Sequence, residues 1–404
     1  MKSTRLQFEN SAGQRLAAIL DQPVTRKPLA YAIFAHCFTC TKNLKAIFHI
    51  NRALTAAGIA VLRFDFTGLG QSEGDFSHTN FSSNVSDLEC AAAYLQQNYQ
   101  APELLIGHSL GGAAAIVAAS KLDSIKAVAT IGSPSEPSHV IQHFNEYREA
   151  IEQCGEASVT LEGKKYTIAK QFLDDVEAIQ LKQTLQHLKA ALLVCHSPGD
   201  KTVNIRHAGE LFQAAQHPKS FISLDNADHL LSNEADARYV GQLISSWASR
   251  FLALDILRQP LSTDEQIVAQ TLADSYYTEI NADDHMLVAD EPKSLGGTDL
   301  GPTPYELLSS ALAACTSITL QMYARRKNIP LQEVRVHITH KKAHADDCIH
   351  CDDSESKIDH FVRRIELFGK LTEQQQHRLL EIAERCPVHR TLHGEVVVIT
   401  ELKG

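Results

Sequence analysis

A serine flanked by glycines stands between an apolar run and a stretch of small residues. The pentapeptide Gly107 to Gly111 (GHSLG) follows the apolar residues Leu104 to Ile106 and precedes Gly112 to Ala115. A nucleophilic serine needs this order of strand, sharp turn and helix, because the strained turn exposes the hydroxyl and tiny neighbours let the backbones approach. A helix start with Ser109 as its cap is the alternative that the pentapeptide alone leaves open.

An aspartate and a histidine follow Ser109 in an order that a catalytic triad could use. Asp200 comes just after the apolar run Ala191 to Cys195, and His229 ends the segment DNADH. A serine hydroxyl is a weak nucleophile until a histidine accepts its proton and a carboxylate orients that histidine. Taken singly, the aspartate could form a turn and the histidine could lie in a surface loop. Together the three residues predict a triad for acyl transfer.

Acyl transfer also needs backbone donors for the negative charge that develops on the substrate oxygen. Leu110 directly follows the serine and would give one N–H. The loop His36-Cys37-Phe38-Thr39 after the first central strand would give the other, and we expect it from Phe38. Cys37 and Cys40 form a C-x-x-C pair, which we interpret as packing or loop residues because no second pair or redox context accompanies them.

Two cysteines in the rear part of the chain could supply thiol chemistry. Cys386 precedes Pro387, which should end a helix over 373–385 and leave the thiol at its C-terminal end. Cys315 lies in an apolar-periodic segment, so we expect it to be buried, and a small thiol that merely fills a helix core is the alternative. The stripe that predicts this burial consists of Leu308, Ala311, Leu312, Ile318 and Met322.

A further group of metal-ligating residue types lies between positions 340 and 353. His344, Cys348, His350 and Cys351 could bind zinc, but their spacing fits no complete set of four ligands. An exposed, acidic extension of a hairpin is the favoured interpretation, and we predict no metal.

The elements that must position the serine, aspartate and histidine follow an alternating pattern. Strand-like runs at 31–35, 60–64, 104–106, 127–131 and 191–195 are separated by helix-length segments, which predicts βαβ units and a mainly parallel, buried sheet with helices on both faces. Polar, helix-forming sequence from 134 to 190 interrupts this rhythm and predicts a helical cap inserted above the sheet.

A different pattern follows residue 264, so we predict two domains in the 404 residues, 1–255 and 264–404, with a linker at 256–263. The rear domain should be of the α+β class. We expect strands at 275–280, 334–339, 361–367 and 395–402, with long helices over 305–326 and 373–385.

Composition restricts the partners and the compartment. The formal charge is −10, and no basic stripe with aromatic residues suggests a nucleic-acid partner. The first 13 residues have no apolar signal core, and no run of about 18 apolar residues predicts a membrane span. Nine cysteines fit reduced thiols better than a disulfide framework. We therefore expect a cytoplasmic protein without nucleic-acid or membrane partners.

The front part resembles the α/β-hydrolase family. The segment 63–72 (RFDFTGLGQS) looks like the family's strand-end turn, and the GHSLG elbow, the aspartate and the histidine follow in the family's order. The resemblance covers about residues 6–254. It implies hydrolysis of ester, thioester or related acyl bonds in a small-molecule substrate. Many members have His-Gly where this chain has His36-Cys37.

The rear part resembles the OsmC/Ohr family over about residues 264–404. The matching motifs are 301–308 (GPTPYELL), 313–315 (AAC) and 386–388 (CPV). The resemblance implies that Cys315 attacks an organic hydroperoxide to give a sulfenic acid, and that Cys386 resolves it as a disulfide for a dithiol reductant to reopen. It also implies a homodimer formed through this domain. Both resemblances imply enzymes without cofactors.

The peroxidase interpretation needs a positive charge near Cys315 to favour the thiolate. Characterised peroxidases of the family use an arginine upstream of this cysteine and a glutamate on its helix, but no arginine occurs from 261 to 324. Glu306 and Arg390 are possible supporting residues, and Lys293, Arg325 or Arg326 could also supply the charge. The competing hypothesis is a serine hydrolase whose OsmC-like module only dimerises or binds a ligand.

Overall fold

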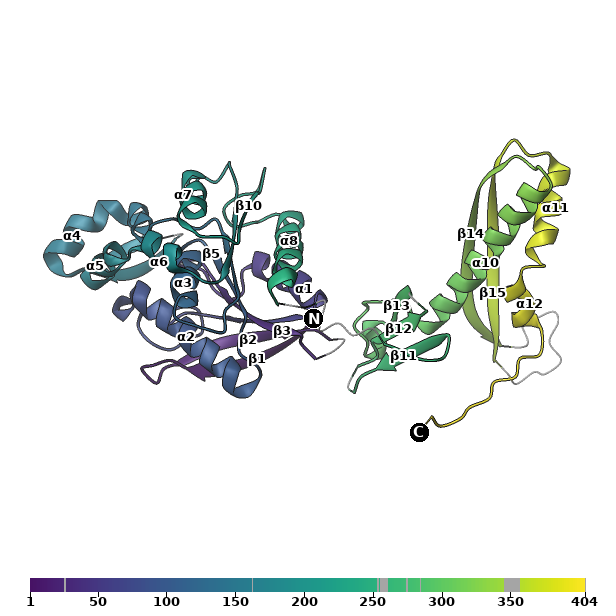
Figure 1. Cartoon of the computed structure of the whole chain (residues 1–404), viewed down its shortest axis with the longest axis horizontal. Helices are drawn as coiled ribbons and strands as arrows, with labels where there is room; N and C mark the ends of the chain where they lie inside the picture. Colours follow the sequence, from purple (N-terminus) through teal and green to yellow (C-terminus); the bar gives the residue numbers. More distant parts are fainter. Residues whose placement is uncertain are drawn as a thin grey trace. The chain divides into compact units, whose positions relative to one another are not determined.

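The computed structural model describes residues 1–24, 27–161, 163–252, 254, 261–273, 275–283, 285–344 and 357–403. The chain divides into two compact units, Met1–Pro260 and Leu261–Gly404 (Figure 1). The predicted domain boundaries, residues 255 and 264, lie on either side of this division. Residues 256–260 of the predicted linker lie outside the described residues.

An eight-stranded sheet forms the centre of the first unit, in the order β1-β2-β4-β3-β5-β6-β9-β10. Strands β1 and β2 are antiparallel, and the six from β4 to β10 in that order are parallel. The prediction of a mainly parallel α/β sheet is confirmed. The strands are β1 (Lys2–Glu9), β2 (Arg15–Gln22), β3 (Ala30–Ala35), β4 (Ile59–Phe64), β5 (Leu104–His108), β6 (Ala127–Ile131), β9 (Ala191–His196) and β10 (Lys219–Ser223).

Helices cover both faces of this sheet, as predicted, and this explains why its central strands are apolar at every position. Alternate side chains of a strand point to opposite faces. Ile33 of β3 packs with the core of α2 (Phe81–Asn98) and α3 (Leu110–Ala119), whereas Phe34 packs with that of α1 (Lys45–Ala56) and α8 (Glu234–Leu252) (Figure 1). A further helix, α7 (Arg206–Ala214), follows β9.

The cap between β6 and β9 is not purely helical, which corrects the prediction. It contains η2 (Pro137–Tyr147), α4 (Arg148–Cys154), α5 (Lys170–Ala178) and α6 (Leu181–His187), but also an antiparallel hairpin of β7 (Glu156–Leu161) and β8 (Lys164–Ala169). The hairpin's half-buried strands alternate polar and apolar residues, and Gly163 at their turn has a φ of +78°, which favours glycine. This alternation was the sequence signal for the two strands.

The second unit is an α+β module. It begins with three antiparallel strands, β11 (Ile267–Thr271), β12 (Thr278–Ala282) and β13 (His285–Ala289), of which only the middle one was predicted. A short η3 (Lys293–Leu295) precedes the long α10 (Pro304–Arg326). An antiparallel pair, β14 (Leu331–His344) and β15 (Lys357–Gly369), follows, and the next two helices, α11 (Glu373–Ala383) and α12 (Pro387–His393), pack against α10 (Figure 1). The helices at 305–326 and 373–385 and the strands at 334–339 and 361–367 are thus found within a few residues.

The predicted terminal strand at 395–402 is wrong, because residues 394–403 form no helix or strand. Their apolar side chains are instead in solvent, with Val397, Val398 and Ile399 exposed to 86%, 82% and 79%. A strand must pair its N–H and C=O groups with a neighbour, and none of the described strands pairs with this segment.

The predicted burial of Cys315 is also wrong, because α10 buries a different stripe. Leu312, Thr316, Leu320 and Ala324, each four residues apart, face inward, and the last two join a small cluster with α11. Cys315 beside this stripe is only half-buried, and the expected stripe residues Ile318 and Met322 are 59% and 67% exposed. By length and composition alone α10 could cross a membrane, a test that core helices also pass. The single chain therefore leaves an apolar face of this helix uncovered.

Candidate active sites

Ser109 lies at the sharp turn between β5 and α3, as the pentapeptide predicts. Its φ of +55° is a conformation that residues other than glycine rarely adopt. Its glycine neighbours are required by close backbone approach. A Cβ on Gly107 would lie 2.3 Å from the carbonyl oxygen of Gly111, and one on Gly111 would lie 2.5 Å from that of Ala35. The strained backbone therefore holds the serine at the end of its strand.

Asp200 and His229 meet in the structure although 29 residues separate them. The Nδ1 atom of His229 lies 2.7 Å from Oδ2 of Asp200. The other carboxylate oxygen accepts hydrogen bonds from the backbone N–H groups of Thr202 and Val203, at 2.8 and 2.9 Å. The carboxylate is therefore fixed by its own loop and orients the imidazole, with Nδ1–H as the donor.

The charge on Asp200 suits this role. Burial by itself would raise the pKa of this carboxyl group, but the hydrogen bonds from His229 and from the N–H groups of Val203 and Thr202 hold the pKa below its usual value. The group is thus ionised at neutral pH, and it stabilises a positive charge on the imidazole when that ring takes up a proton.

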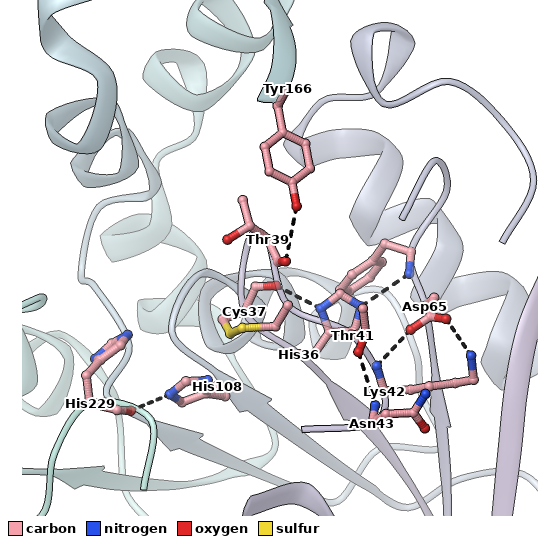
Figure 2. Close-up of a disulfide and its surroundings, with 12 residues drawn as sticks. His36, Cys37, Thr39, Thr41, Lys42, Asn43, Asp65, His108, Tyr166 and His229 are labelled. Atoms are coloured by element: carbon pink, nitrogen blue, oxygen red, sulfur yellow. Dashed lines mark hydrogen bonds and ion pairs between the residues drawn. A yellow bond between two sulfur atoms is a disulfide. The ribbon is translucent and has the colours of Figure 1, made fainter. Parts of the chain in front are cut away.

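Two residues that the sequence analysis missed support the histidine. His108, inside the pentapeptide, donates its Nε2–H to the carbonyl oxygen of His229 at 2.6 Å (Figure 2). Burial, and then the neighbouring His229, lowers the pKa of His108 to about 3, so the ring stays neutral. Gly132 follows β6 with a φ of +56°, and a Cβ there would lie 3.2 Å from Nδ1 of His229. A glycine directly after a buried strand was the available signal.

Ser109 and His229 line the same cavity, of about 320 Å³, between the sheet edge and the cap. The cap contributes Thr160 and Leu161 of its hairpin to the lining. The ring of Phe38 forms part of the wall and packs against aromatic residues of the cap and of the loop after β4, at ring-centre distances between 5.0 and 6.4 Å. These partners are Phe76, Phe144 and Phe172.

The loop after β3 carries the predicted oxyanion donor and corrects one prediction. Cys37 and Cys40 are joined by a disulfide, with Cα atoms 5.2 Å apart (Figure 2), whereas we expected packing or loop residues with reduced thiols. A tight turn brings them together, since the N–H of Cys40 donates to the carbonyl oxygen of Cys37 at 3.2 Å. This hydrogen bond uses the N–H of Cys40 and not that of Phe38, the donor that we predicted for the oxyanion. The N–H of Leu110 belongs to the first turn of α3, which offers no acceptor within the helix.

In the second unit, buried Cys386 lies just after the end of α11, where its N–H donates to the carbonyl oxygen of Ala383 at 3.3 Å, and it also caps the start of α12. Its sulfur accepts the N–H of His389 at 3.3 Å and lies 3.6 Å from the hydroxyl of Thr316, the residue after Cys315 on α10. Cys315 and Cys386 are both free thiols. The two cysteines thus belong to adjoining elements.

Arg363 of β15 supplies the positive charge nearest to these contacts, and the sequence analysis missed it. Its guanidinium donates to the Thr316 hydroxyl at 3.0 Å and to the carbonyl oxygen of Ala383 at 3.1 Å, and it pairs with Glu384 at 2.7 Å. Its side chain is only 9% exposed. The four basic residues that we considered, Lys293, Arg325, Arg326 and Arg390, are all exposed.

Glu306 has a structural partner of its own. Its carboxylate accepts the N–H of Thr303 at 2.7 Å, while the Thr303 hydroxyl accepts the N–H of Glu306, so the two form a capping box at the start of α10. The sequence T-P-Y-E was the signal for it. Of the possible zinc ligands, Cys348, His350 and Cys351 lie outside the described residues, and His344 ends β14. Elsewhere in the described chain no group of three His, Cys, Asp or Glu side chains could hold a metal ion.

Comparisons with known proteins agree with both units. The esterase domain of a Rhodothermus marinus protein is 48% identical in sequence to this chain and superimposes on it with a TM-score of 0.52. The alignment covers 62% of this chain and all of that domain. The chain belongs to the α/β hydrolases. A family model described as serine aminopeptidase, S33, matches residues 34–146 of this hydrolase, and one described as OsmC-like protein matches residues 297–401. It is therefore an α/β hydrolase fused to an OsmC-like domain.

Two more distant relatives of this hydrolase extend the comparison. Rat palmitoyl-protein thioesterase ABHD10, mitochondrial, is 24% identical over 212 residues, which covers half of this chain and 70% of that protein. Est1E from Butyrivibrio proteoclasticus, solved with ferulic acid bound, shares 18% identity and a TM-score of 0.53 over 61% of this chain and 99% of that one. The second likeness concerns the fold alone.

Proposed function

We propose that the first unit is a serine acyl hydrolase that uses Ser109, His229 and Asp200. The Ser109 hydroxyl attacks the substrate carbonyl while Nε2 of His229 accepts its proton, and the N–H groups of Phe38 and Leu110 stabilise the oxyanion. The protonated histidine then gives its proton to the leaving alcohol or thiol. Water attacks the resulting acyl-enzyme by the same route in reverse and releases the acid.

The observation that carries this proposal is the 2.7 Å contact between His229 and Asp200 beside a cavity that Ser109 also lines. A carboxylate that orients the histidine through Nδ1 is the feature of a triad that is least expected by chance. The strained φ of Ser109 supports the same role.

The lining of the cavity favours esters or thioesters of small to medium carboxylic acids. A volume of about 320 Å³ lies at the small end of ligand pockets, and the Phe38 ring offers an apolar wall for an acyl chain. The names of two relatives support the bond type alone, since one is an esterase domain and the other a palmitoyl-protein thioesterase.

Labelling with an active-site phosphonate tests the hydrolase. The wild type should be labelled on Ser109 and should hydrolyse p-nitrophenyl esters, with rates that fall as the acyl chain outgrows the cavity. Ser109→Ala should lose both labelling and turnover. Ser135→Ala is the control, because Ser135 is a buried serine of the same unit whose hydroxyl is bonded to His207 and Glu210. Labelling that persists in Ser109→Ala would exclude this serine as the nucleophile.

We propose thiol peroxidase chemistry as a second function of the OsmC-like unit. Cys315 would attack an organic hydroperoxide, releasing an alcohol, and Cys386 would displace water from the sulfenic acid to form a disulfide that a dithiol reductant reopens. The buried Arg363, linked through Thr316 to Cys386, favours this over a purely structural module. Dithiol-dependent consumption of cumene hydroperoxide should be lost in Cys315→Ser. A scaffold that only dimerises or binds a ligand would form no selective Cys315–Cys386 disulfide after mild peroxide treatment.

The OsmC-like unit also carries the expected homodimer. The uncovered face of α10, with Ile318 and Met322, and the exposed apolar residues 396–399 are the surfaces that a second copy would bury. Sedimentation of the whole protein should give a dimer, and Met322→Asp should shift it to a monomer. A monomeric wild type would contradict this part of the proposal.

A further inference from the structure

The disulfide in the loop after β3 has no part in the acyl-transfer steps above, although both of its cysteines line the cavity that holds Ser109. We propose that Cys37 and Cys40 form a redox site that controls the hydrolase, with the disulfide as the active state and a small dithiol as the reductant. This inference rests on the proposed serine hydrolase.

The surrounding contacts show that only the middle of this loop depends on the disulfide (Figure 2). At one end, His36 donates its Nδ1–H to the carbonyl oxygen of Cys37 at 2.7 Å, and it is buried. At the other end, the N–H of Lys42 donates to buried Asp65 at 2.7 Å, and its ammonium group pairs with the same carboxylate. Neither anchor uses a sulfur atom, so both should persist when the sulfur–sulfur bond is broken.

Between these anchors the backbone makes few other hydrogen bonds, and the remaining restraint on Phe38 is the packing of its ring against Phe76, Phe144 and Phe172. The turn keeps one hydrogen bond, at 3.2 Å, and the carbonyl oxygen of Thr39 receives the hydroxyl of Tyr166 at 3.5 Å, a long contact (Figure 2). The N–H of Phe38 lies inside this stretch. An oxyanion donor must be held in place before the charge develops, so loss of the disulfide would loosen the donor without unfolding the unit.

The short spacing of the two cysteines argues against a purely stabilising disulfide. Closing a loop between residues three apart removes little entropy from the unfolded chain, so the effect of the bond on overall stability is small. Its main physical consequence is local, at the turn that carries Phe38. The cavity also gives a small thiol a route to the sulfurs, and Cys40 is the more exposed of the two.

An organic hydroperoxide is the oxidant of this site, and a dithiol is its reductant. In the oxidising direction, one thiolate attacks a hydroperoxide and the O–O bond breaks. The alcohol is released, and the cysteine becomes a sulfenic acid. The second thiol displaces water from it and forms the disulfide. In the reducing direction, a thiolate of the dithiol attacks one sulfur, and its second thiol then closes its own disulfide, which leaves Cys37 and Cys40 as thiols.

Kinetics of the full chain in two redox states tests the proposal. Treatment with dithiothreitol should lower kcat for a p-nitrophenyl ester by about tenfold. This is less than the loss expected when one oxyanion donor is removed, because the donor is only loosened. Cumene hydroperoxide should restore it, and alkylation with mass spectrometry should follow the thiols of Cys37 and Cys40. The double variant Cys37→Ser/Cys40→Ser should stay at the reduced rate in both states with an unchanged circular dichroism spectrum. Cys154→Ser, at an exposed free cysteine, should respond like the wild type.

The outcomes separate this inference from the proposed function. Hydrolysis that survives Ser109→Ala would overturn the proposed hydrolase. Hydrolysis that depends on Ser109 but has the same kcat before and after reduction would overturn the redox site alone. A rate that rises on reduction, or a double variant as fast as the oxidised wild type, would overturn the assignment of the disulfide as the active state.

Discussion

Replacing Gly132 by alanine tests whether the contact between His229 and Asp200 depends on an empty position beside it. Gly132 follows β6 and adopts a φ of +56°. An added Cβ would lie 3.2 Å from Nδ1 of His229 and 3.3 Å from Oδ2 of Asp200, whereas ordinary van der Waals contact begins at 3.4 Å. Both side chains would therefore have to move by a few tenths of an ångström.

Two separate costs follow from this geometry. A left-handed conformation costs a residue with a Cβ about 1–2 kcal/mol, which would lower Tm by roughly 2–8 °C in a unit of this size. A misplacement of about 1 Å in an active site can cost roughly a hundredfold in rate, so a shift of a few tenths should lower kcat about three- to tenfold. KM should change little, because Gly132 is not among the residues that line the cavity.

Ester hydrolysis and thermal unfolding of Gly132→Ala measure the two costs, and Gly13→Ala is the matched control. Gly13 has a φ of +75°, but no atom lies within 4 Å of its hypothetical Cβ. It should lose a similar amount of stability and keep its kcat. Wild-type kcat in Gly132→Ala, or an equal loss of kcat in Gly13→Ala, would refute the steric argument.

Three further predictions concern charged groups. Asp200→Asn should lower kcat about 10³- to 10⁴-fold, measured on the same ester, because the imidazole loses the partner that orients it. Burial raises the pKa of Asp87 to about 6, so the folded protein binds a proton that the unfolded chain has released. Stability should thus fall as pH rises from about 4 to 6, by about 3 kcal/mol, and urea unfolding of Asp87→Asn should lack this part of the slope. Arg363→Gln should slow peroxide consumption about tenfold or more, whereas Arg364→Gln, at the exposed neighbouring position, should not; equal effects would exclude a special role for Arg363.

The sequence predicted the central sheet well because its strands are buried on both faces. Runs such as Ala127–Ile131 contain no charged residue, and this continuity survives in any tertiary context. The cap hairpin was missed because its half-buried strands carry many polar residues. The segment 395–402 has the composition of a strand, but none of the described strands pairs with it, and composition alone does not reveal whether a partner is in reach.

In the candidate sites too, local sequence patterns could be predicted, whereas contacts between distant residues could not. The turn at Ser109 and the contact between Asp200 and His229 could be anticipated, because local context marks each residue by an elbow or by a position after a strand. Gly132 and Arg363 act through contacts with residues far away in sequence, and no local pattern reveals such contacts. The disulfide between Cys37 and Cys40 lay within reach of sequence reasoning, since two cysteines three residues apart on a turn can approach to bonding distance.

The small buried cluster shared by α10 and α11 has a consequence for how the OsmC-like unit responds to dilution. If a second copy completes its core, its melting temperature should rise with protein concentration by mass action, while that of the hydrolase unit should not. In a dilute solution the melting temperature of the rear unit would then fall, while that of the hydrolase unit would stay the same. The abundance of the protein would thus decide whether Cys386 remains sheltered, so thiol chemistry would be available only where the chain accumulates.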